Sequence, residues 1–203
     1  MKAPASASVP ASFLPDAEGW VPAARRVPSP NFDDRPEGMP VDLVVLHNIS
    51  LPPGQFGSGD IEAFFQNRLD PDRHPFFATI HQVQVSAHFL VRRDGELVQF
   101  VPCGKRAWHA GLSDFFGRGR CNDFSVGIEI EGADDQPFTA AQYATTATLV
   151  KALRTTLPVQ AIAGHSDIAP GRKTDPGPHF DWDRFARLAD VPQNLLPYRP
   201  SHS

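Results

Sequence analysis

VDLVVLHNIS (residues 41–50) is dominated by leucine and β-branched residues and has a histidine near its end. A short, continuous apolar run of this kind is typical of a strand that is buried inside a sheet. The run predicts a strand over residues 42–47, with His47 at its end and Asn48 directly after it. We therefore expect the fold to be organised around a buried strand that delivers an imidazole to the edge of a sheet.

A second imidazole lies in GHSDIAPGRKTDPGP (residues 164–178), a loop that also contains Lys173 and Asp175. Its prolines limit the backbone conformations that the loop can adopt. Catalytic zinc usually takes three protein ligands and leaves a fourth position open, and nitrogen and oxygen donors together favour zinc over magnesium. The sequence thus predicts a zinc site of His47, His165 and Asp175 at the mouth of a mixed sheet. A single histidine at a strand end is more often structural, so the prediction depends on all three donors.

The bulk composition is that of a globular protein with one domain. The chain has 203 residues, of which 41% are hydrophobic and 21% charged, and its formal net charge is -4. This charge gives no electrostatic reason to expect nucleic acid or an anionic membrane as a partner. We expect a monomer that acts on a small or moderately sized molecule. Cys103 and Cys121 lack the spacing of a metal or redox motif and are expected to be free thiols.

The two ends of the chain differ in composition from its centre. Residues 1–18 are rich in alanine, serine and proline, which predicts a flexible arm, and residues 191–203 are expected to form a flexible tail. Residues 19–190 form the predicted domain, which begins with an extended leader over residues 19–42. The amino terminus lacks the apolar core of a secretory signal, and no apolar run approaches the length of a membrane span, so we expect a cytoplasmic protein.

The segment after the first strand predicts a helix followed by a loop. DIEAFFQNRL (residues 60–69) has an amphipathic pattern, with Asp60 as the candidate cap. The apolar residues on one helical face are Ile61, Phe64, Phe65 and Leu69. Residues 70–85 are long, mixed and without periodicity, which predicts a loop that borders the pocket.

Two further strands are expected to form a hairpin. The apolar runs over residues 86–93 and 96–102 flank Asp94-Gly95, and an Asp-Gly pair in that position is a strong hairpin signal. The next segment, residues 105–125, is too polar and glycine-rich for a core element. Loops of this kind often contact ligands.

SVGIEIE (residues 125–131) alternates apolar and other residues, which predicts a strand with Glu129 and Glu131 on one face. Such a pair is often only a solvated face. Thr139 and Gln142 then form a capping box before a long helix that ends near Pro158. With a short strand over 159–164 and a final helix over 180–189, the pattern predicts an α/β domain with a central mixed sheet flanked by helices.

The predicted metal site suggests a hydrolytic mechanism. Zinc lowers the pKa of water and polarises a carbonyl group, which suits hydrolysis of an amide or an ester. Glu129 is the candidate general base if it faces the cavity, Glu131 is the alternative, and Lys173 can stabilise the developing oxyanion. His88 and His109 are candidates for contacts behind the ligands or with the substrate. The remaining histidines have no spacing that singles them out.

Several segments together carry a resemblance to a known family. VVLHNISLPPG, SAHFLVRRDGELVQFVP, KRAWHAG, RCNDFSVGIEIEG and GHSDIAPGRKTDPGP resemble the AmpD family of zinc-dependent anhydro-muramoyl-alanine amidases, over about residues 19–185. The wider group includes peptidoglycan-recognition domains with a mixed sheet flanked by helices. The resemblance implies hydrolysis of the amide between the 1,6-anhydro-N-acetylmuramoyl group and L-alanine in muropeptides recycled from the cell wall, which is a cytosolic process.

The resemblance also implies roles for individual residues. His47, His165 and Asp175 are expected to hold zinc, while Glu129 and Lys173 are expected to act on water and on the tetrahedral intermediate. The expected substrate contacts are Asn48, Trp108, His109 and Arg120. In this family, loss of activity lets anhydro-muropeptides accumulate and induce a β-lactamase. The amino-terminal arm departs from the family pattern.

Three other functions remain open from the sequence. A domain of this group can bind muropeptides without cleaving them if a zinc ligand is missing, but this chain has all three. An exported amidase that acts on intact peptidoglycan uses the same ligands. A cysteine-nucleophile hydrolase is the weakest alternative, because neither Cys103 nor Cys121 lies beside an evident base.

Overall fold

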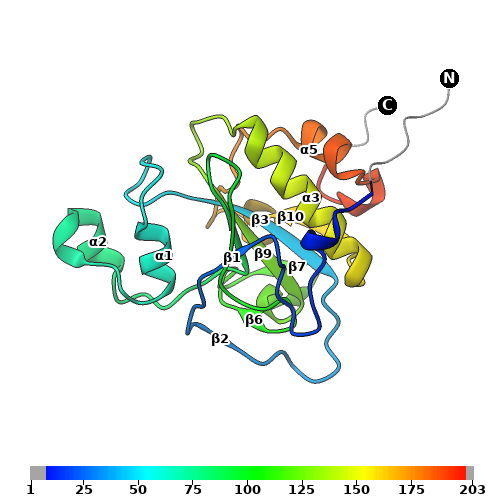
Figure 1. The fold of residues 1–203 in the computed structure, drawn as a ribbon, viewed down its shortest axis with the longest axis horizontal. Helices are drawn as coiled ribbons and strands as arrows, with labels where there is room; N and C mark the ends of the chain where they lie inside the picture. The colour runs from blue at the N-terminus through cyan, green and yellow to red at the C-terminus, as the bar shows by residue number, and fades with distance from the viewer. Residues whose placement is uncertain (1–7, 200–203) are drawn as a thin grey trace.

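The protein is built around one mixed sheet of six strands. The structure is a computed structural model that describes residues 8–199. In spatial order the strands are β1 (Arg25–Arg26), β5 (Leu97–Gln99), β4 (Phe89–Val91), β9 (Ser125–Glu131), β3 (Leu43–Ile49) and β10 (Ala161–Gly164) (Figure 1). All neighbours are parallel except β4 and β5, which form the predicted hairpin. The prediction of a central mixed sheet is confirmed.

Helices flank this sheet. The long helix α3 (Ala140–Thr156) packs on α5 (Trp182–Ala189), and the two lie together in Figure 1. The short helices α1 (Asp60–Phe65) and α2 (Pro75–Ile80) lie at the opposite end of the molecule in that view. A one-turn helix, α4 (His165–Ile168), follows β10 directly. Two small ribbons pair β2 (Phe32–Asp33) with β6 (Arg106–Ala107), and β7 (Asp114–Phe115) with β8 (Arg118–Gly119).

Four turns of 3-10 helix complete the secondary structure of the described chain. They are Ala11–Phe13, Pro71–Arg73, Cys121–Asp123 and Gln193–Leu195. The Cys121–Asp123 turn leads into β9, so it fixes where this central strand begins.

The alternation of β9 sorts its side chains as the sequence predicts. Its valine and isoleucines join the core under α3. The inward residues of α3 in that core include Tyr143, Ala147, Val150 and Leu153. Glu129 and Glu131 point to the other face, and both are buried rather than solvated. The predicted capping box is present, since Thr139 Oγ1 accepts from the Gln142 backbone N–H and the Thr139 N–H donates to Gln142 Oε1.

The prediction that Asp60 caps α1 is wrong. The N-cap is Gly59, and it provides no side-chain hydrogen bond. Asp60 is instead a buried first-turn residue, paired with Arg73 at 2.5 Å. The carboxylate is still favourable at a helix N-terminus, but an ion pair with a residue beyond the helix determines its position.

We expected residues 70–85 to form a loop, but part of this segment is helical. It contains the Pro71–Arg73 turn and α2. His74 caps α2 by accepting a hydrogen bond from the Phe76 backbone N–H on its Nδ1, and Pro75 occupies the first turn, where its missing N–H costs nothing. The helix is too short for its apolar pattern to stand out in the sequence.

The leader and the two ends pack more closely than the composition suggests. The leader is extended as expected, and its β1 joins the sheet beside β5. Phe13 in the predicted arm packs against the core, and Leu196 in the predicted tail is buried. Arg199 pairs with Asp167 at 2.6 Å. Parts of the predicted arm and tail therefore contact the domain, while residues 1–7 and 200–203 lie outside the described chain.

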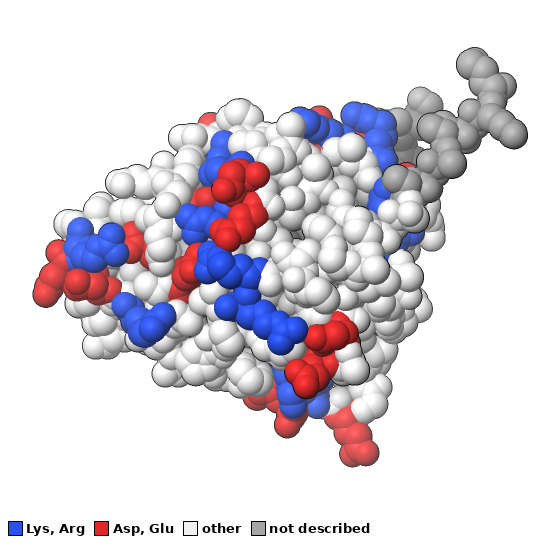
Figure 2. All heavy atoms as spheres, viewed as in Figure 1, with Lys and Arg blue, Asp and Glu red and all other residues white. Residues whose placement is uncertain are grey.

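Charged residues of both signs alternate on the face shown in Figure 2, where lysine and arginine side chains lie beside acidic ones. Ion pairs such as Arg25–Glu62 and Arg106–Asp33 join side chains of opposite charge. Among residues 8–199, no helix combines the length and the apolar character that crossing a membrane requires.

Candidate metal centre

The sheet topology brings two histidines to the same edge. Strands β3 and β10 are parallel neighbours, with Leu46 opposite Gly164, so the residues that follow these two lie side by side. These residues are His47, inside β3, and His165, the first residue of α4. The loop after α4 returns to the same place, because the Ser166 N–H donates to the backbone carbonyl of Asp175 at 2.9 Å.

The three predicted ligands converge. His47 Nδ1 lies 3.0 Å from His165 Nδ1, and Asp175 Oδ2 lies 3.0 Å from the former and 3.1 Å from the latter. A tetrahedral zinc ion with bonds of about 2.0–2.1 Å separates its ligand atoms by about 3.3–3.4 Å. The triangle is thus close to the size that such an ion requires, and the predicted convergence of two imidazoles and one carboxylate is confirmed.

The hydrogen-bond partners around this triangle show that it suits a cation. His165 Nε2 lies 3.1 Å from the Ala110 carbonyl, which can only accept, so Nε2 carries a proton, and in the neutral ring Nδ1 has a free lone pair. Arg172 Nη2 lies 3.4 Å from the same nitrogen, but this guanidinium group donates to the Ala110 and Leu112 carbonyls at 2.8 and 2.6 Å. When the His165 ring is neutral, two electron-rich atoms, His165 Nδ1 and Asp175 Oδ2, therefore face each other with no proton between them. A bound metal ion removes this repulsion, and the donor set fits the predicted group.

Glu129 lies directly beside the triangle. It is the register partner of His47 across β3 and β9, and its side chain lines the same pocket. Its Oε2 is buried and has no hydrogen-bond partner among residues 8–199. Burial raises the pKa of Glu129 well above its usual value, Asp175 adds to the shift, and the Lys173 charge opposes it. Glu129 is therefore a carboxyl group with an unused oxygen and an increased affinity for a proton.

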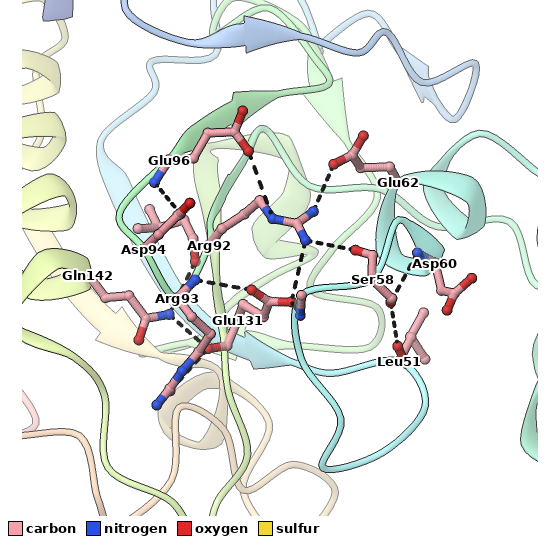
Figure 3. Close-up of polar contacts among 12 residues, drawn as sticks. Leu51, Ser58, Asp60, Glu62, Arg92, Arg93, Asp94, Glu96, Glu131 and Gln142 are labelled. Carbon is pink, nitrogen blue, oxygen red and sulfur yellow. Dashed lines mark hydrogen bonds and ion pairs between the residues drawn. The ribbon is translucent and has the colours of Figure 1, made fainter.

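Glu131, the alternative base, is occupied elsewhere. Figure 3 shows its carboxylate within a network of polar contacts that also includes Arg92 and Arg93. Its Oε1 accepts from the Gly57 N–H at 2.7 Å, and its Oε2 accepts from the Arg93 N–H at 3.0 Å. Arg92 lies 3.9 Å from Oε1. Since Glu131 is fully buried and does not line the metal pocket, its role is structural.

The metal triangle opens into a pocket of about 200 Å3. Its lining residues are His47, Asn48, Ile49, Phe64, Phe65, Val85, Ser86, Trp108, His109, Glu129, His165, Lys173 and Asp175. A second hollow of about 320 Å3 shares Trp108, Lys173 and other wall residues with the first. The two form one continuous depression, and residues 84 and 85, at the end of the predicted border segment, lie in its wall.

Three of the four predicted substrate contacts, Asn48, Trp108 and His109, line this depression. Trp108 is half-buried between the two hollows, and its Nε1 donates to Asp33 at 3.2 Å. Asn48 lines the first hollow, but its amide donates to Asp134 Oδ1 at 2.7 Å and to the Pro176 carbonyl at 3.1 Å. Asn48 therefore also holds neighbouring loops in place.

The structure does not bring Arg120 to the pocket. Its backbone adopts the left-handed conformation, with φ of 61°, and its side chain is 75% exposed and paired with Asp123 at 3.2 Å. It is not among the described residues that line either hollow. The turn before Cys121 directs the Arg120 side chain outward, and its contact with the substrate stays a prediction.

His109 lines both hollows, and its ring lies behind His47, which is one of the two positions that the sequence left open. Its ring is buried behind His47, with Nδ1 2.9 Å from His47 Nε2 and Nε2 3.1 Å from Ser125 Oγ. Both ring nitrogens therefore have partners within the protein, and a contact of His109 with the substrate stays a prediction. Burial lowers the pKa of His109 well below its usual value. Burial likewise lowers the pKa of His47 to about 4, so both rings are neutral.

Sequence reasoning misses the residues that support this arrangement. The pattern places Ser125 and Gly127 in a strand and says no more, although a glycine within a strand often marks the close approach of another group. A Cβ atom at Gly127 would lie 2.4 Å from Cγ of His109. Phe64 and Phe65 belong to the predicted helix face, and they also form the apolar wall of the pocket.

Comparisons with known proteins agree with this site. The family model described as N-acetylmuramoyl-L-alanine amidase matches residues 37–178. A curated relative, the 1,6-anhydro-N-acetylmuramyl-L-alanine amidase AmpD of Salmonella typhimurium, is 57% identical over 178 residues, which cover 87% of this chain and 95% of the relative.

Solved structures show the same fold. The crystal structure of a selenomethionine AmpD derivative matches with a TM-score of 0.83 and 57% identity, covering 84% of this chain and 97% of that chain. A mutant of Drosophila PGRP-LB in complex with tracheal cytotoxin matches with a TM-score of 0.54 and 17% identity, covering 83% and 89%, which is a likeness of fold alone. Taken with the family match over the residues that hold the metal triangle, these results show that the chain belongs to the N-acetylmuramoyl-L-alanine amidase family.

Proposed function

We propose that this protein is a zinc-dependent amidase that cleaves the amide between the N-acetylmuramoyl group, in its 1,6-anhydro form, and L-alanine of muropeptides. The observation that carries the proposal is the convergence of His47, His165 and Asp175 within 3.0–3.1 Å, beside a buried glutamate with an unused oxygen. The substrate class follows from the relative named as an anhydro-muramyl amidase, which matches 87% of the chain.

Zinc is the metal that we propose for the triangle. Two neutral imidazole nitrogens and one carboxylate oxygen form a donor set of the kind used by catalytic zinc sites, whereas magnesium prefers oxygen ligands alone. When bound, zinc lowers the pKa of water toward neutrality and polarises a carbonyl oxygen. His47, His165 and Asp175 would hold the ion, and the pocket gives access to it.

Glu129 is the proposed general base. It lies next to His47 in the sheet, and one oxygen lacks a partner among the described residues, so it can accept a proton from the attacking water. Its raised pKa suits this task, because a carboxylate with increased proton affinity takes the proton more readily and can then pass it to the leaving amine. Burial in the pocket wall keeps this proton away from bulk solvent.

Lys173 is the proposed stabiliser of the oxyanion. It is exposed on the loop between His165 and Asp175 and lines both hollows. A positive charge at that position favours the negative charge that develops on the carbonyl oxygen during attack. Trp108 and Asn48 lie in the wall of the same depression, where we expect them to contact the sugar or the peptide.

The location of the reaction and the oligomeric state are further parts of the proposal. The resemblance to enzymes of cell-wall recycling favours a cytoplasmic monomer acting on soluble muropeptides. The chief rival is an exported amidase acting on intact peptidoglycan, which would use the same metal triangle.

The test uses purified protein and a soluble 1,6-anhydro-N-acetylmuramoyl tripeptide. We expect zinc-loaded protein to release free stem peptide, a chelator to abolish release, and added zinc to restore it. No release by zinc-loaded protein would favour a muropeptide-binding module, and release unchanged by chelation would exclude the metal mechanism. A higher rate on insoluble sacculi than on the soluble tripeptide would favour the exported amidase.

A further inference from the structure

A line of hydrogen bonds runs from His47 into the protein, away from the metal triangle. His47 Nε2 lies 2.9 Å from His109 Nδ1, and His109 Nε2 lies 3.1 Å from Ser125 Oγ. Ser125 Oγ donates to the Cys121 backbone carbonyl at 2.6 Å. The line thus joins the ligand of β3 to the turn that precedes β9, and it passes through His109 on the way.

The far end of this line fixes the direction of every bond in it. A carbonyl oxygen can only accept, so the Ser125 hydroxyl proton points to Cys121 and the lone pairs of Oγ are left to accept from His109. His109 then carries its proton on Nε2, and its bare Nδ1 accepts the proton on His47 Nε2. Since a neutral imidazole has one proton, His47 Nδ1 keeps a free lone pair. That nitrogen is the one that points at His165 and Asp175.

The position of His109 is fixed by packing as well. Its ring lies against the backbone of β9, where Gly127 has no side chain, and a Cβ there would lie within 2.4 Å of the ring. Its backbone N–H donates to Asn122 Oδ1 at 3.1 Å. Ser125 is fully buried. The ring therefore has little freedom to turn.

We propose that His109 is a positioning residue that holds His47 in the tautomer and orientation needed to bind the metal. The inference rests on the proposed zinc site and gives a specific role to a residue that the sequence suggested as a contact behind the ligands or with the substrate. A partner of this kind, bound to the second nitrogen of a histidine ligand, typically changes metal affinity about 10- to 100-fold.

The experiment compares two variants of equal shape. In His109→Asn, the side-chain Oδ1 is attached to Cγ as Nδ1 is in histidine, so it can still accept from His47 Nε2. In His109→Leu, the branched shape remains but the acceptor is lost. We expect the zinc dissociation constant, measured by competition with a chromophoric chelator, to increase about 10- to 100-fold for His109→Leu and only a few-fold for His109→Asn.

Ser125→Ala tests the outer link, because it removes the oxygen that accepts from His109. We expect a smaller loss of zinc affinity than for His109→Leu, since the first hydrogen bond of the line remains. A larger loss for Ser125→Ala would contradict the proposal. Equal zinc affinity of His109→Leu and His109→Asn would also overturn it, because the acceptor for His47 Nε2 would then make no difference to metal binding.

A measurement on the unmodified protein decides the case even if a variant does not fold. The 15N chemical shifts of the imidazoles report which nitrogen carries the proton, and we expect His109 to carry it on Nε2, with or without zinc. A proton on Nδ1 of His109 would overturn the inference. Wild-type protein that binds no zinc would refute the proposed metal site, whereas zinc-binding wild-type protein with equal variants would refute only the role of His109.

Discussion

Glu129 and Glu131 lie two residues apart on the same face of β9, yet their surroundings are opposite. Glu131 is 1% exposed and accepts two backbone N–H groups, from Gly57 and Arg93. Glu129 is 8% exposed, and its Oε2 has no partner among residues 8–199. A polar group without a partner costs free energy when it is buried, so the fold retains such a group chiefly where a reaction or a ligand uses it.

The network around Glu131 serves to hold the pocket wall. Arg92 donates to Glu62 of α1 at 2.9 Å and to the Ser58 carbonyl at 2.8 Å, and it approaches Glu96 at 3.8 Å (Figure 3). Together with the Gly57 contact, these bonds tie the segment before α1 to the sheet. Since α1 supplies Phe64 and Phe65 to the pocket, this satisfied network helps to shape the site around the unsatisfied glutamate.

The largest expected effect comes from removing a metal ligand. His165→Ala or Asp175→Ala takes away one of three donors, and we expect metal content to fall from one ion per chain toward zero and turnover to fall to background. Metal analysis and stem-peptide release, measured on the same samples, check this. Full metal content in either variant would mean that the ion is held elsewhere.

Glu129→Gln should have the next largest effect. The amide cannot accept the proton of water, so we expect turnover to fall about 10²- to 10⁴-fold while zinc content stays at the wild-type level. The comparison of metal content with kcat separates a base from a ligand. An active Glu129→Gln enzyme would assign the base to another group.

Glu131→Gln is the matched control for Glu129→Gln, because it makes the same change at the glutamate that has hydrogen-bond partners. One of its two backbone N–H partners would lose its acceptor, so we expect a loss of about 1–3 kcal/mol in unfolding free energy. The folded fraction should keep its metal and most of its turnover. Denaturant unfolding and activity per folded molecule check the two parts, and a stable but inactive Glu131→Gln enzyme would reverse the roles of the two glutamates.

The smallest effect is expected at the cysteines. Both are buried, and burial raises the pKa of Cys103 to about 12 and raises that of Cys121 as well. Because the thiolate is the nucleophile, neither thiol is suited to attack a substrate. We expect Cys103→Ser and Cys121→Ser to keep stem-peptide release near the wild-type rate. A loss of turnover in a folded variant would revive the cysteine-nucleophile alternative.

Local patterns determined much of what the sequence predicts correctly. The apolar run before His47, the alternation of β9 and the Thr139–Gln142 capping box each depend on neighbouring residues, and each appears in the structure. The same limit explains the errors. Asp60 has the chemistry of a cap, but its partner Arg73 lies beyond the helix, and no local pattern reports that contact.

The sequence by itself determined the strands, the long helix and the three donor types of the metal triangle, because periodicity and side-chain chemistry depend on residues that are close together in the chain. Only the tertiary structure decided which glutamate is free, why Arg120 lies outside the pocket, and why His109 lies behind His47. These outcomes depend on hydrogen-bond partners that come from distant parts of the chain, such as Gly57 for Glu131 and Ser125 for His109. The free energy of a buried polar group is set by such partners, and folding alone brings them together.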